Sequence, residues 1–253
     1  MIVVSNGLGT NSTALLVGLK ERGIRPDLIL FADTGGERPH TYNHLKIMQQ
    51  WLKRVGFPEI TVVKKVDKNG DVLTLEDDCL NKNMLPSVAY GFKTCSQKYK
   101  IAPQDKFMNN YSPAKDFWKS GGVITKLIGF DADEPQRAEK DYSCNKYNCQ
   151  HPLIEWNWGR DECKAAIERA GLPQAGKSSC FFCPNSKPSE IKELNAVYPE
   201  LMYRCIKMER NAELTTIKGL GRGNFSWENL VKTDDMFPYP DAEMPCGCYD
   251  GDE

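Results

Sequence analysis

Residues 1–66 alternate short runs of aliphatic and β-branched residues with longer stretches whose apolar residues recur every three or four positions. The short runs MIVVS, DLILFADTG and ITVVKKV have the length and composition of strands, and the stretches between them have the spacing of helices. The elements therefore follow the order strand, helix, strand, helix, strand. This order predicts an α/β fold with a parallel sheet.

Each of the two predicted helices carries one apolar face. In the first helix Leu15, Leu16 and Leu19 share a face, and Gly23 stands where a helix commonly ends. The second helix covers residues 40–56, and its apolar face is formed by Tyr42, Leu45, Met48, Trp51 and Leu52. We expect both helices to pack on the sheet through right-handed crossovers.

The remaining chain is less regular. A further strand is predicted over residues 123–130, and helices are predicted over residues 161–170 and from about Ser189. The segment 143–150 is rich in Cys and Asn and is expected to be a loop. We therefore expect two domains. Residues 1–160 would form the sheet with helices on both faces, and residues 161–253 a Cys-rich, mostly helical subdomain.

Composition excludes several classes of protein. The chain has 253 residues, a formal net charge of −1 and 40% hydrophobic residues, which is enough for one sizeable core and excludes a mainly disordered protein. No stretch approaches the roughly 18 apolar residues that a membrane span needs, and the N-terminus lacks the pattern of a secretory signal. A cytoplasmic protein is expected. In such a reducing compartment, ten cysteines indicate ligands, redox thiols or core residues rather than disulfides.

One segment is strongly basic. Between residues 92 and 126 the only acidic residues are Asp105 and Asp116, against seven lysines: Lys93, Lys98, Lys100, Lys106, Lys115, Lys119 and Lys126. Such a segment would attract an anionic partner such as a nucleic acid. A solvated helical face would have the same composition, so charge alone leaves both interpretations open.

The loop after the first strand has the composition of a phosphate-binding loop. Glycines allow close approach of the backbone, hydroxyls donate hydrogen bonds, and the start of the following helix favours an anion. The residues expected to bind the nucleotide phosphates are Ser5, Gly7, Gly9, Asn11, Ser12 and Thr13. A turn with no ligand is the alternative, because Gly, Ser and Asn also favour turns.

The loop after the second strand adds a second group of candidates. Asp33 stands at the strand end, where it could hold Mg²⁺ through water or accept a hydrogen bond from a nucleoside, and Gly35 would face the nucleoside. His40 is expected near the nucleotide through this loop, and His44, one helical turn later, is expected on the surface.

A third loop, GFDADEPQRA, follows the strand over residues 123–130. Its polar side chains are Asp131, Asp133, Glu134 and Arg137. Arg137 could contact a phosphate with the forked geometry that lysine lacks. Because the carboxyl ends of parallel strands meet at one edge of a sheet, all three loops are expected at that edge.

The cysteines give the strongest indication of a metal. Cys180 and Cys183 form a C-x-x-C pair, a spacing that allows two thiolates to reach one metal ion or cluster. Cys246 and Cys248 form a C-x-C pair on a predicted turn, and Cys95 lies among lysines that would favour its thiolate, so it could be a ligand or a reactive thiol. Spacing alone leaves both an iron–sulfur cluster and zinc open.

The other cysteines carry weaker indications. Cys163 and Cys205 lie at helical positions where burial as small apolar residues is expected. Cys144 and Cys149 could clamp a second metal from a polar loop, and Cys79 has no motif around it.

Five segments in this order resemble the phosphoadenosine phosphosulfate (PAPS) reductase family, a member of the adenine nucleotide α-hydrolase-like superfamily. The segments are SNGLGTNSTALL, which resembles the PP-loop, FADTGGERPHTY, TCSQKYKIAP, IGFDADEPQRA, and HPLIEWNWGRDEC with the later KSSCFFCPNSK. The resemblance covers roughly residues 1–215 and is closest to the phage and bacterial branch related to DNA phosphorothioation proteins. This sequence departs from the usual SGGxDS loop, since Asn6 replaces a glycine and Asn11 replaces the acidic residue.

The resemblance implies a Rossmann-like sheet of the HUP type, an adenine nucleotide (ATP or PAPS) with Mg²⁺, and a [4Fe–4S] cluster, with zinc as the alternative. It implies an enzyme acting near the α-phosphate, either by ATP-dependent activation and sulfur transfer or by reduction of a sulfonucleotide through Cys246. Arg137, with Lys98 or Lys100, would neutralise the charge that develops on the leaving group. A sulfur- or electron-donor protein and a nucleic-acid substrate are possible partners. The competing hypothesis is a module without turnover that binds nucleic acid or is stabilised by zinc.

Overall fold

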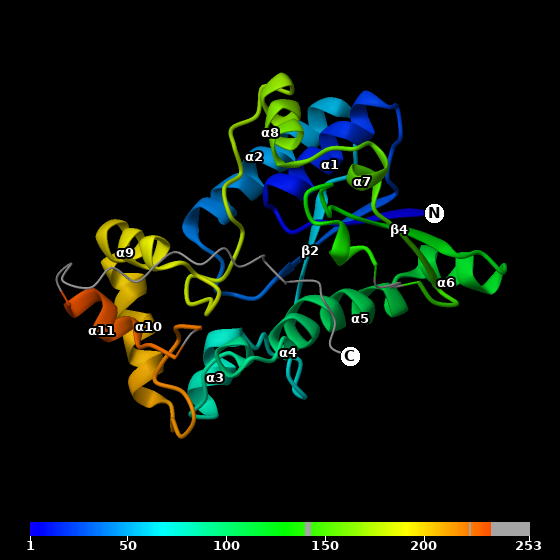
Figure 1. Cartoon of the computed structure of the whole chain (residues 1–253). Helices are drawn as coiled ribbons and strands as arrows, with labels where there is room; N and C mark the ends of the chain where they lie inside the picture. Colours follow the sequence, from blue (N-terminus) through cyan, green and yellow to red (C-terminus); the bar gives the residue numbers. More distant parts are fainter. Residues whose placement is uncertain (140–142, 223, 234–253) are drawn as a thin grey trace. The chain divides into compact units, whose positions relative to one another are not determined.

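The fold is built on a five-stranded sheet with the strand order β3-β2-β1-β4-β5 (Figure 1). The computed structural model describes residues 1–139, 143–222 and 224–233. The strands are β1 Ile2–Ser5, β2 Leu28–Asp33, β3 Ile60–Lys64, β4 Ile124–Ile128 and β5 Tyr147–Gln150. β1 pairs in parallel with β2 and with β4, and β4 pairs in parallel with β5. The predicted parallel α/β fold is confirmed.

The strand β5 was not expected from the sequence, where segment 143–150 reads as a loop. β5 has the residues YNCQ, none of which is fully buried. An edge strand has one neighbour and a partly solvated face, so it needs no alternating apolar pattern. Its backbone hydrogen bonds to β4, rather than buried side chains, hold it in the sheet.

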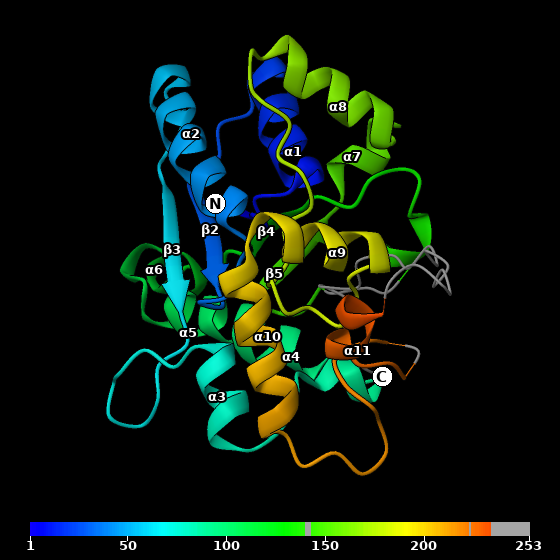
Figure 2. The ribbon, with the colours of Figure 1, turned by 90° about the vertical axis from the view of Figure 1, so that its left-hand side faces the viewer.

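Helices cover both faces of the sheet. On one face Val4, Ile29 and Leu127 pack with residues of α1, α2 and α8, and on the other Val3, Leu30 and Ile124 pack with residues of α5 and α6 (Figures 1 and 2). These helices and the short α7 are α1 Thr10–Glu21, α2 Pro39–Val55, α5 Ala102–Asn110, α6 Ser112–Lys119, α7 Pro152–Glu155 and α8 Arg160–Arg169. The predicted helices over 40–56 and 161–170 are confirmed to within one residue at each end.

The chain divides into two compact units, and neither is continuous in sequence. The first unit contains residues 1–32, 38–63 and 103–178, and the second contains residues 33–37, 64–102 and the chain from residue 179 onward. The backbone therefore passes between the units five times. The two domains predicted from the sequence, residues 1–160 and 161–253, are instead separated by a single boundary. That domain assignment stays a prediction.

The second unit is mainly helical. Its elements are α3 Leu75–Asn81, the 3₁₀ helix η1 Ser87–Tyr90, α4 Thr94–Ser96, the π-helical turn η2 Gln97–Ile101, α9 Pro188–Val197, α10 Pro199–Asn211 and α11 Trp227–Lys232. Its core contains Phe181, Phe182, Ile191 and Trp227 and shares no residue with the cores of the first unit.

A buried carboxylate fastens the last described helix to α10. Glu209 on α10 accepts hydrogen bonds from the backbone amides of Leu220, Trp227 and Glu228 and from the hydroxyl of Ser226, over distances of 2.6–3.0 Å. A buried carboxylate is stable only when its oxygens are paired in this way. Glu209 thus determines how the segment before α11 closes onto α10.

None of the described helices is both long and apolar enough to cross a membrane.

Candidate functional site

The loop that joins β1 to α1 has a fixed backbone. Leu8 has a positive φ of 59°, which is uncommon outside glycine, and its side chain is completely buried in the core. The side-chain oxygen of Asn6 accepts a hydrogen bond from the Leu8 amide at 2.6 Å. This local bond and the buried leucine together hold the turn that leads to Gly9.

The start of α1 presents backbone donors, and no acidic residue of its own lies beside them. Gly9 is the N-cap, and the Ser12 hydroxyl lies 3.1 Å from both its amide and its carbonyl oxygen. The first turn of α1 contains no acidic residue. The first amides of a helix have no partner within the helix, and the helix dipole adds positive potential there, so this end suits an anion such as phosphate.

Two of the predicted phosphate-binding residues are held by side chains that the sequence did not indicate. The Ser5 hydroxyl donates to Gln104 Oε1 at 2.6 Å, and Thr13 Oγ1 lies 2.9 Å from Nε2 of His44. His44 is buried, so its expected surface position was wrong: the face of α2 that carries it packs against α1. Burial, with the charge of His40 second, lowers the pKa of His44 below its usual value.

The segment before the C-x-x-C pair approaches the phosphate loop within the first unit. A Cβ atom added at Gly9 would lie 3.1 Å from Oγ of Ser178, so the absence of a side chain at Gly9 permits this contact. His40 Nε2 lies 2.9 Å from the carbonyl oxygen of Lys177. The loop after β1 is therefore bordered by residues more than 160 positions later in the sequence, a contact that no local pattern predicts.

Asn11 contacts the loop after β4. Its Nδ2 donates to Asp131 Oδ2 at 2.8 Å, and its Oδ1 accepts from Arg160 Nη1 at 2.9 Å. A Cβ added at Gly129 would lie 3.1 Å from the carbonyl group of Asn11, so only glycine lets the end of β4 come this close to α1. The edge of the sheet thus brings the first and third predicted loops together.

Arg137 is largely occupied within its own loop. Its Nη1 donates to Glu134 Oε2 at 2.8 Å, and its guanidinium lies over the ring of Phe130, 4.2 Å from the ring centroid. A role at the leaving group stays a prediction and would require the arginine to leave these contacts.

In the second unit, Asp33 and Gly35 form a tight turn. Asp33 Oδ1 accepts from the Gly35 amide at 2.8 Å, and Oδ2 lies 3.2 Å from the ammonium of Lys64. Gly35 has a φ of 78°, and a Cβ there would lie 2.4 Å from the methyl group of Thr74. Glycine is required on both counts.

Three of the predicted metal ligands line one pocket of the second unit. Cys95 comes from α4, and Cys180 and Cys183 come from the turn before α9, in which the Cys183 amide donates to the Cys180 carbonyl at 3.0 Å. The pocket is lined by Thr34, Leu75, Pro86, Val88, Lys93, Cys95, Ser96, Lys100, Ser179, Cys180, Phe182, Cys183, Pro184 and Asn185. The fold therefore gathers thiols that are 85 residues apart in sequence.

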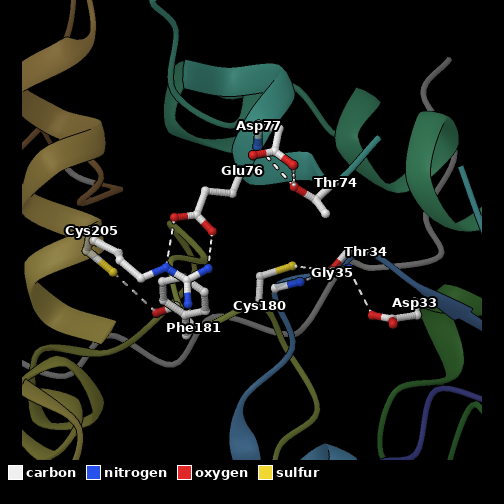
Figure 3. Close-up of polar contacts among 11 residues, drawn as sticks. Asp33, Thr34, Gly35, Thr74, Glu76, Asp77, Cys180, Phe181 and Cys205 are labelled. Carbon is white, nitrogen blue, oxygen red and sulfur yellow. Dashed lines mark hydrogen bonds and ion pairs between the residues drawn. The ribbon is translucent and has the colours of Figure 1, made fainter. Parts of the chain in front are cut away.

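The surroundings of Cys180 combine a hydrogen bond with a buried ion pair. Its Sγ lies 3.1 Å from the hydroxyl of Thr34 (Figure 3), and Lys100 Nζ lies 3.5 Å from Oε1 of the buried Glu37. Burial raises the pKa of the Cys180 thiol well above its usual value, the charge of Glu37 raises it further, and Lys100 lowers it. A cation bound at the sulfur would therefore favour the thiolate.

An arginine and a glutamate support the turn that carries Cys180. The Nε of Arg204 on α10 donates to Glu76 Oε1 of α3 at 2.9 Å, and its guanidinium lies 4.5 Å from the ring centroid of Phe181. Figure 3 shows Glu76, Phe181 and Cys180 in this arrangement. The position of the first cysteine is thus set by the packing of α3 against α10.

Lys98 lies at a different pocket from the one that holds the three cysteines. With Cys95 it lines a neighbouring cavity whose other polar residues include Asp78, Lys82 and Tyr99. Lys82 is paired with Asp78 at 2.7 Å. The structure thus brings Lys98 near Cys95, within the second unit.

The remaining cysteine expectations have different outcomes. Cys163 and Cys205 are completely buried, as predicted, and burial raises the pKa of Cys163 to about 12. Within the described part of the chain, no three His, Cys, Asp or Glu side chains converge closely enough to hold a single metal ion. Cys246 and Cys248 lie outside the described residues.

Comparison with known proteins gives a limited result. No family model matches the chain, and no curated protein matches it. Among solved structures, the chain is similar to the U34-tRNA thiolase NcsA from Methanococcus maripaludis with its [4Fe-4S] cluster. The TM-score is 0.45 and the sequence identity 15%, over 96% of this chain and 83% of that chain.

Proposed function

We propose that this protein is an adenine-nucleotide-dependent sulfur-transfer enzyme of the PP-loop kind with a cysteine-held iron–sulfur cluster. The observation that carries the proposal is the pocket of the second unit in which Cys95, Cys180 and Cys183 meet. Nearby lysines favour the thiolate, which is the form of cysteine that binds metals and reacts, and cysteine thiolates are the usual ligands of iron–sulfur clusters.

The first unit would bind the nucleotide. The amides at the start of α1, with the hydroxyl of Ser12, would contact the phosphates, the Gly7–Gly9 turn would allow the backbone to approach them, and Thr13 would support the loop through His44. In the proposed reaction, an acceptor oxygen attacks the α-phosphorus of ATP. The new oxygen–phosphorus bond yields an adenylate, and the bond to the bridging oxygen breaks and releases pyrophosphate. Donors already fixed on the helix would stabilise the charge that develops.

The three cysteines fit a cluster better than a single zinc ion. Zinc binds thiolates at about 2.3 Å and so draws its ligands close together. A cluster distributes its cysteines over separate iron atoms, which suits thiols that surround a pocket without converging on one point. Cys95, Cys180 and Cys183 would hold the cluster, which would supply a site for sulfur chemistry. Cys246 or Cys248 is a candidate for a further ligand.

The chain's own residues would adjust this site. Lys93 and Lys100 line the pocket and offset the negative charge of three thiolates, while Leu75, Val88 and Phe182 keep part of the wall apolar. The hydroxyl of Thr34 would hydrogen-bond to the Cys180 sulfur. Hydrogen bonds to ligating sulfur and a low-polarity wall both tune the potential of a cluster.

Anaerobic purification tests the cluster. We expect a brown protein with iron and acid-labile sulfide, and we expect Cys95→Ala, Cys180→Ala and Cys183→Ala each to lose the visible absorption. The exposed Cys144 of the first unit provides the matched control, Cys144→Ala, which should keep it. A colourless protein with stoichiometric zinc would refute the cluster and favour a zinc-stabilised module.

Nucleotide titration tests the other half of the proposal. ATP should bind more tightly than PAPS, and Ser12→Ala should weaken ATP binding while Ser112→Ala, at the exposed start of α6, should not. Sulfite release from PAPS that disappears in Cys246→Ala would replace sulfur transfer with sulfonucleotide reduction. Binding of oligonucleotides with a steep salt dependence, without any nucleotide binding, would favour the module without turnover.

A further inference from the structure

The phosphate loop itself offers no carboxylate for a cation. The loop and the first turn of α1 contain no Asp or Glu, and Asn11 in that first turn carries an uncharged amide. Nucleotide phosphates in enzymes are commonly bound with Mg²⁺, which takes oxygen ligands and usually one or two protein carboxylates. A carboxylate would therefore have to come from outside the loop.

The fold places one directly against Asn11. Asp131, three residues after β4, accepts a hydrogen bond from Asn11 Nδ2 at 2.8 Å through its Oδ2. Arg160 donates to the other end of the Asn11 side chain at 2.9 Å, so the amide cannot turn its oxygen toward Asp131 without losing both bonds. Asn11 thus holds the Asp131 carboxylate at the start of α1.

Among the residues that the structure describes, the second oxygen of this carboxylate has no hydrogen-bond partner. Asp131 is only 3% exposed, and within the described residues its Oδ1 is buried without a hydrogen-bond donor. Leaving a buried carboxylate oxygen unpaired is costly, and a cation would satisfy it. Asp33, the earlier candidate for Mg²⁺, differs in this respect, because its two oxygens contact the Gly35 amide and Lys64.

The local charge also favours a cation. Burial raises the pKa of Asp131, and the charges of Glu134 and Asp133 in the same loop raise it further, while the hydrogen bond from Asn11 and the charge of Arg160 lower it. Phosphate groups at the start of α1 would add more negative charge to the same place. A divalent cation between the phosphates and Asp131 would offset both.

We propose that Asp131 is the protein ligand of the divalent cation that accompanies the nucleotide, and that Asn11 positions it. The carboxylate that this loop lacks is thus supplied from the end of β4. The inference rests on the proposed binding of a nucleotide at this loop. One carboxylate is enough, because phosphate oxygens and water complete the shell of Mg²⁺. This agrees with the absence, among the described residues, of a group of three side chains that could hold a metal alone.

Calorimetric titration of the full-length protein tests the proposal. The probe is an ATP analogue that resists hydrolysis, and its affinity is measured with Mg²⁺ and again with EDTA. We expect Mg²⁺ to tighten binding to the unaltered protein, and we expect Asp131→Asn to reduce that gain by at least about tenfold while affinity in EDTA is kept. The control Asp133→Asn, which alters an exposed carboxylate of the same loop, should keep the full gain.

An exchange variant separates metal binding from folding. Asn11→Asp combined with Asp131→Asn retains one carboxylate, one amide and a hydrogen bond between them, and we expect it to recover the Mg²⁺ gain. If Asp131→Asn does not fold, the exchange variant decides, and loss of the gain in its folded form would overturn the proposal. If folded Asp131→Asn keeps the full Mg²⁺-dependent gain in affinity, the role of Asp131 as cation ligand is overturned, while the proposed nucleotide binding is not. Failure of the unaltered protein to bind any nucleotide would overturn the proposed function as well.

Discussion

At the scale of single residues, His44 links the two helices nearest the phosphate loop and gives the fold a dependence on pH. Burial lowers its pKa in the folded protein from 6.5, so the unfolded chain binds the proton more readily. Stability is therefore fully present above about pH 6.5 and is lost as the pH falls. We expect the urea midpoint to drop between about pH 7.5 and pH 5.5, and to drop less in His44→Gln. An equal drop in both proteins would assign the effect to other groups.

Glu209 makes a second prediction at this scale. Removing its carboxylate leaves three backbone amides and a hydroxyl without an acceptor in the interior of the second unit. We expect Glu209→Ala to lower the free energy of unfolding by at least about 3 kcal/mol, because each unpaired buried donor is costly. Glu209→Gln keeps one acceptor oxygen and should cost less. If denaturant titrations give Glu209→Ala and Glu209→Gln the same loss of unfolding free energy, packing rather than hydrogen bonding accounts for the effect.

At the scale of elements, α1 fits closely against α7 and the turn that follows it. A Cβ at Gly18 would lie 2.3 Å from the Trp156 ring, which is too close for any side chain. Replacing glycine by alanine inside a helix normally stabilises it by about 1 kcal/mol, but overpacking costs about 1–3 kcal/mol. We expect Gly18→Ala to destabilise the protein in urea titrations, and to destabilise it less once Trp156→Leu has removed the nearer ring, because the Trp158 ring stays 3.0 Å from the same Cβ. Equal destabilisation in both backgrounds would contradict this explanation.

The elements also show what the sequence predicts and what it does not. The strands β1, β2 and β4 and the helices α1, α2 and α8 were predicted because buried elements need continuous or periodic apolar residues. β5 was missed because an edge strand does not. In the site, spacing and neighbouring lysines single out the C-x-x-C pair and Cys95, which line one pocket, and their role as metal ligands stays a prediction. Thr34, His44 and Asp131 gain their partners through contacts across 31 or more residues, which local patterns do not record.

At the scale of the whole molecule, the two units have separate apolar cores. Ile167 in the first unit and Ile191 in the second are both completely buried, so an Ile→Ala change removes the same buried apolar atoms from each core. We expect Ile191→Ala to cost about 2–5 kcal/mol and to speed amide exchange in α9–α11 but not in α1. Ile167→Ala should give the opposite pattern. Faster exchange in both units after either change would mean that they unfold together.

The five passages of the backbone between the units also bear on how such a protein can arise. Neither unit corresponds to one stretch of a gene, so joining two genes at a single point would not produce this arrangement of the two units. A single deletion would not remove either unit alone. The short segment Asp33–Glu37 illustrates this, because it contributes Thr34 to the cysteine pocket and lies between two segments of the first unit. A single exchange point within the chain would therefore divide at least one of the two units.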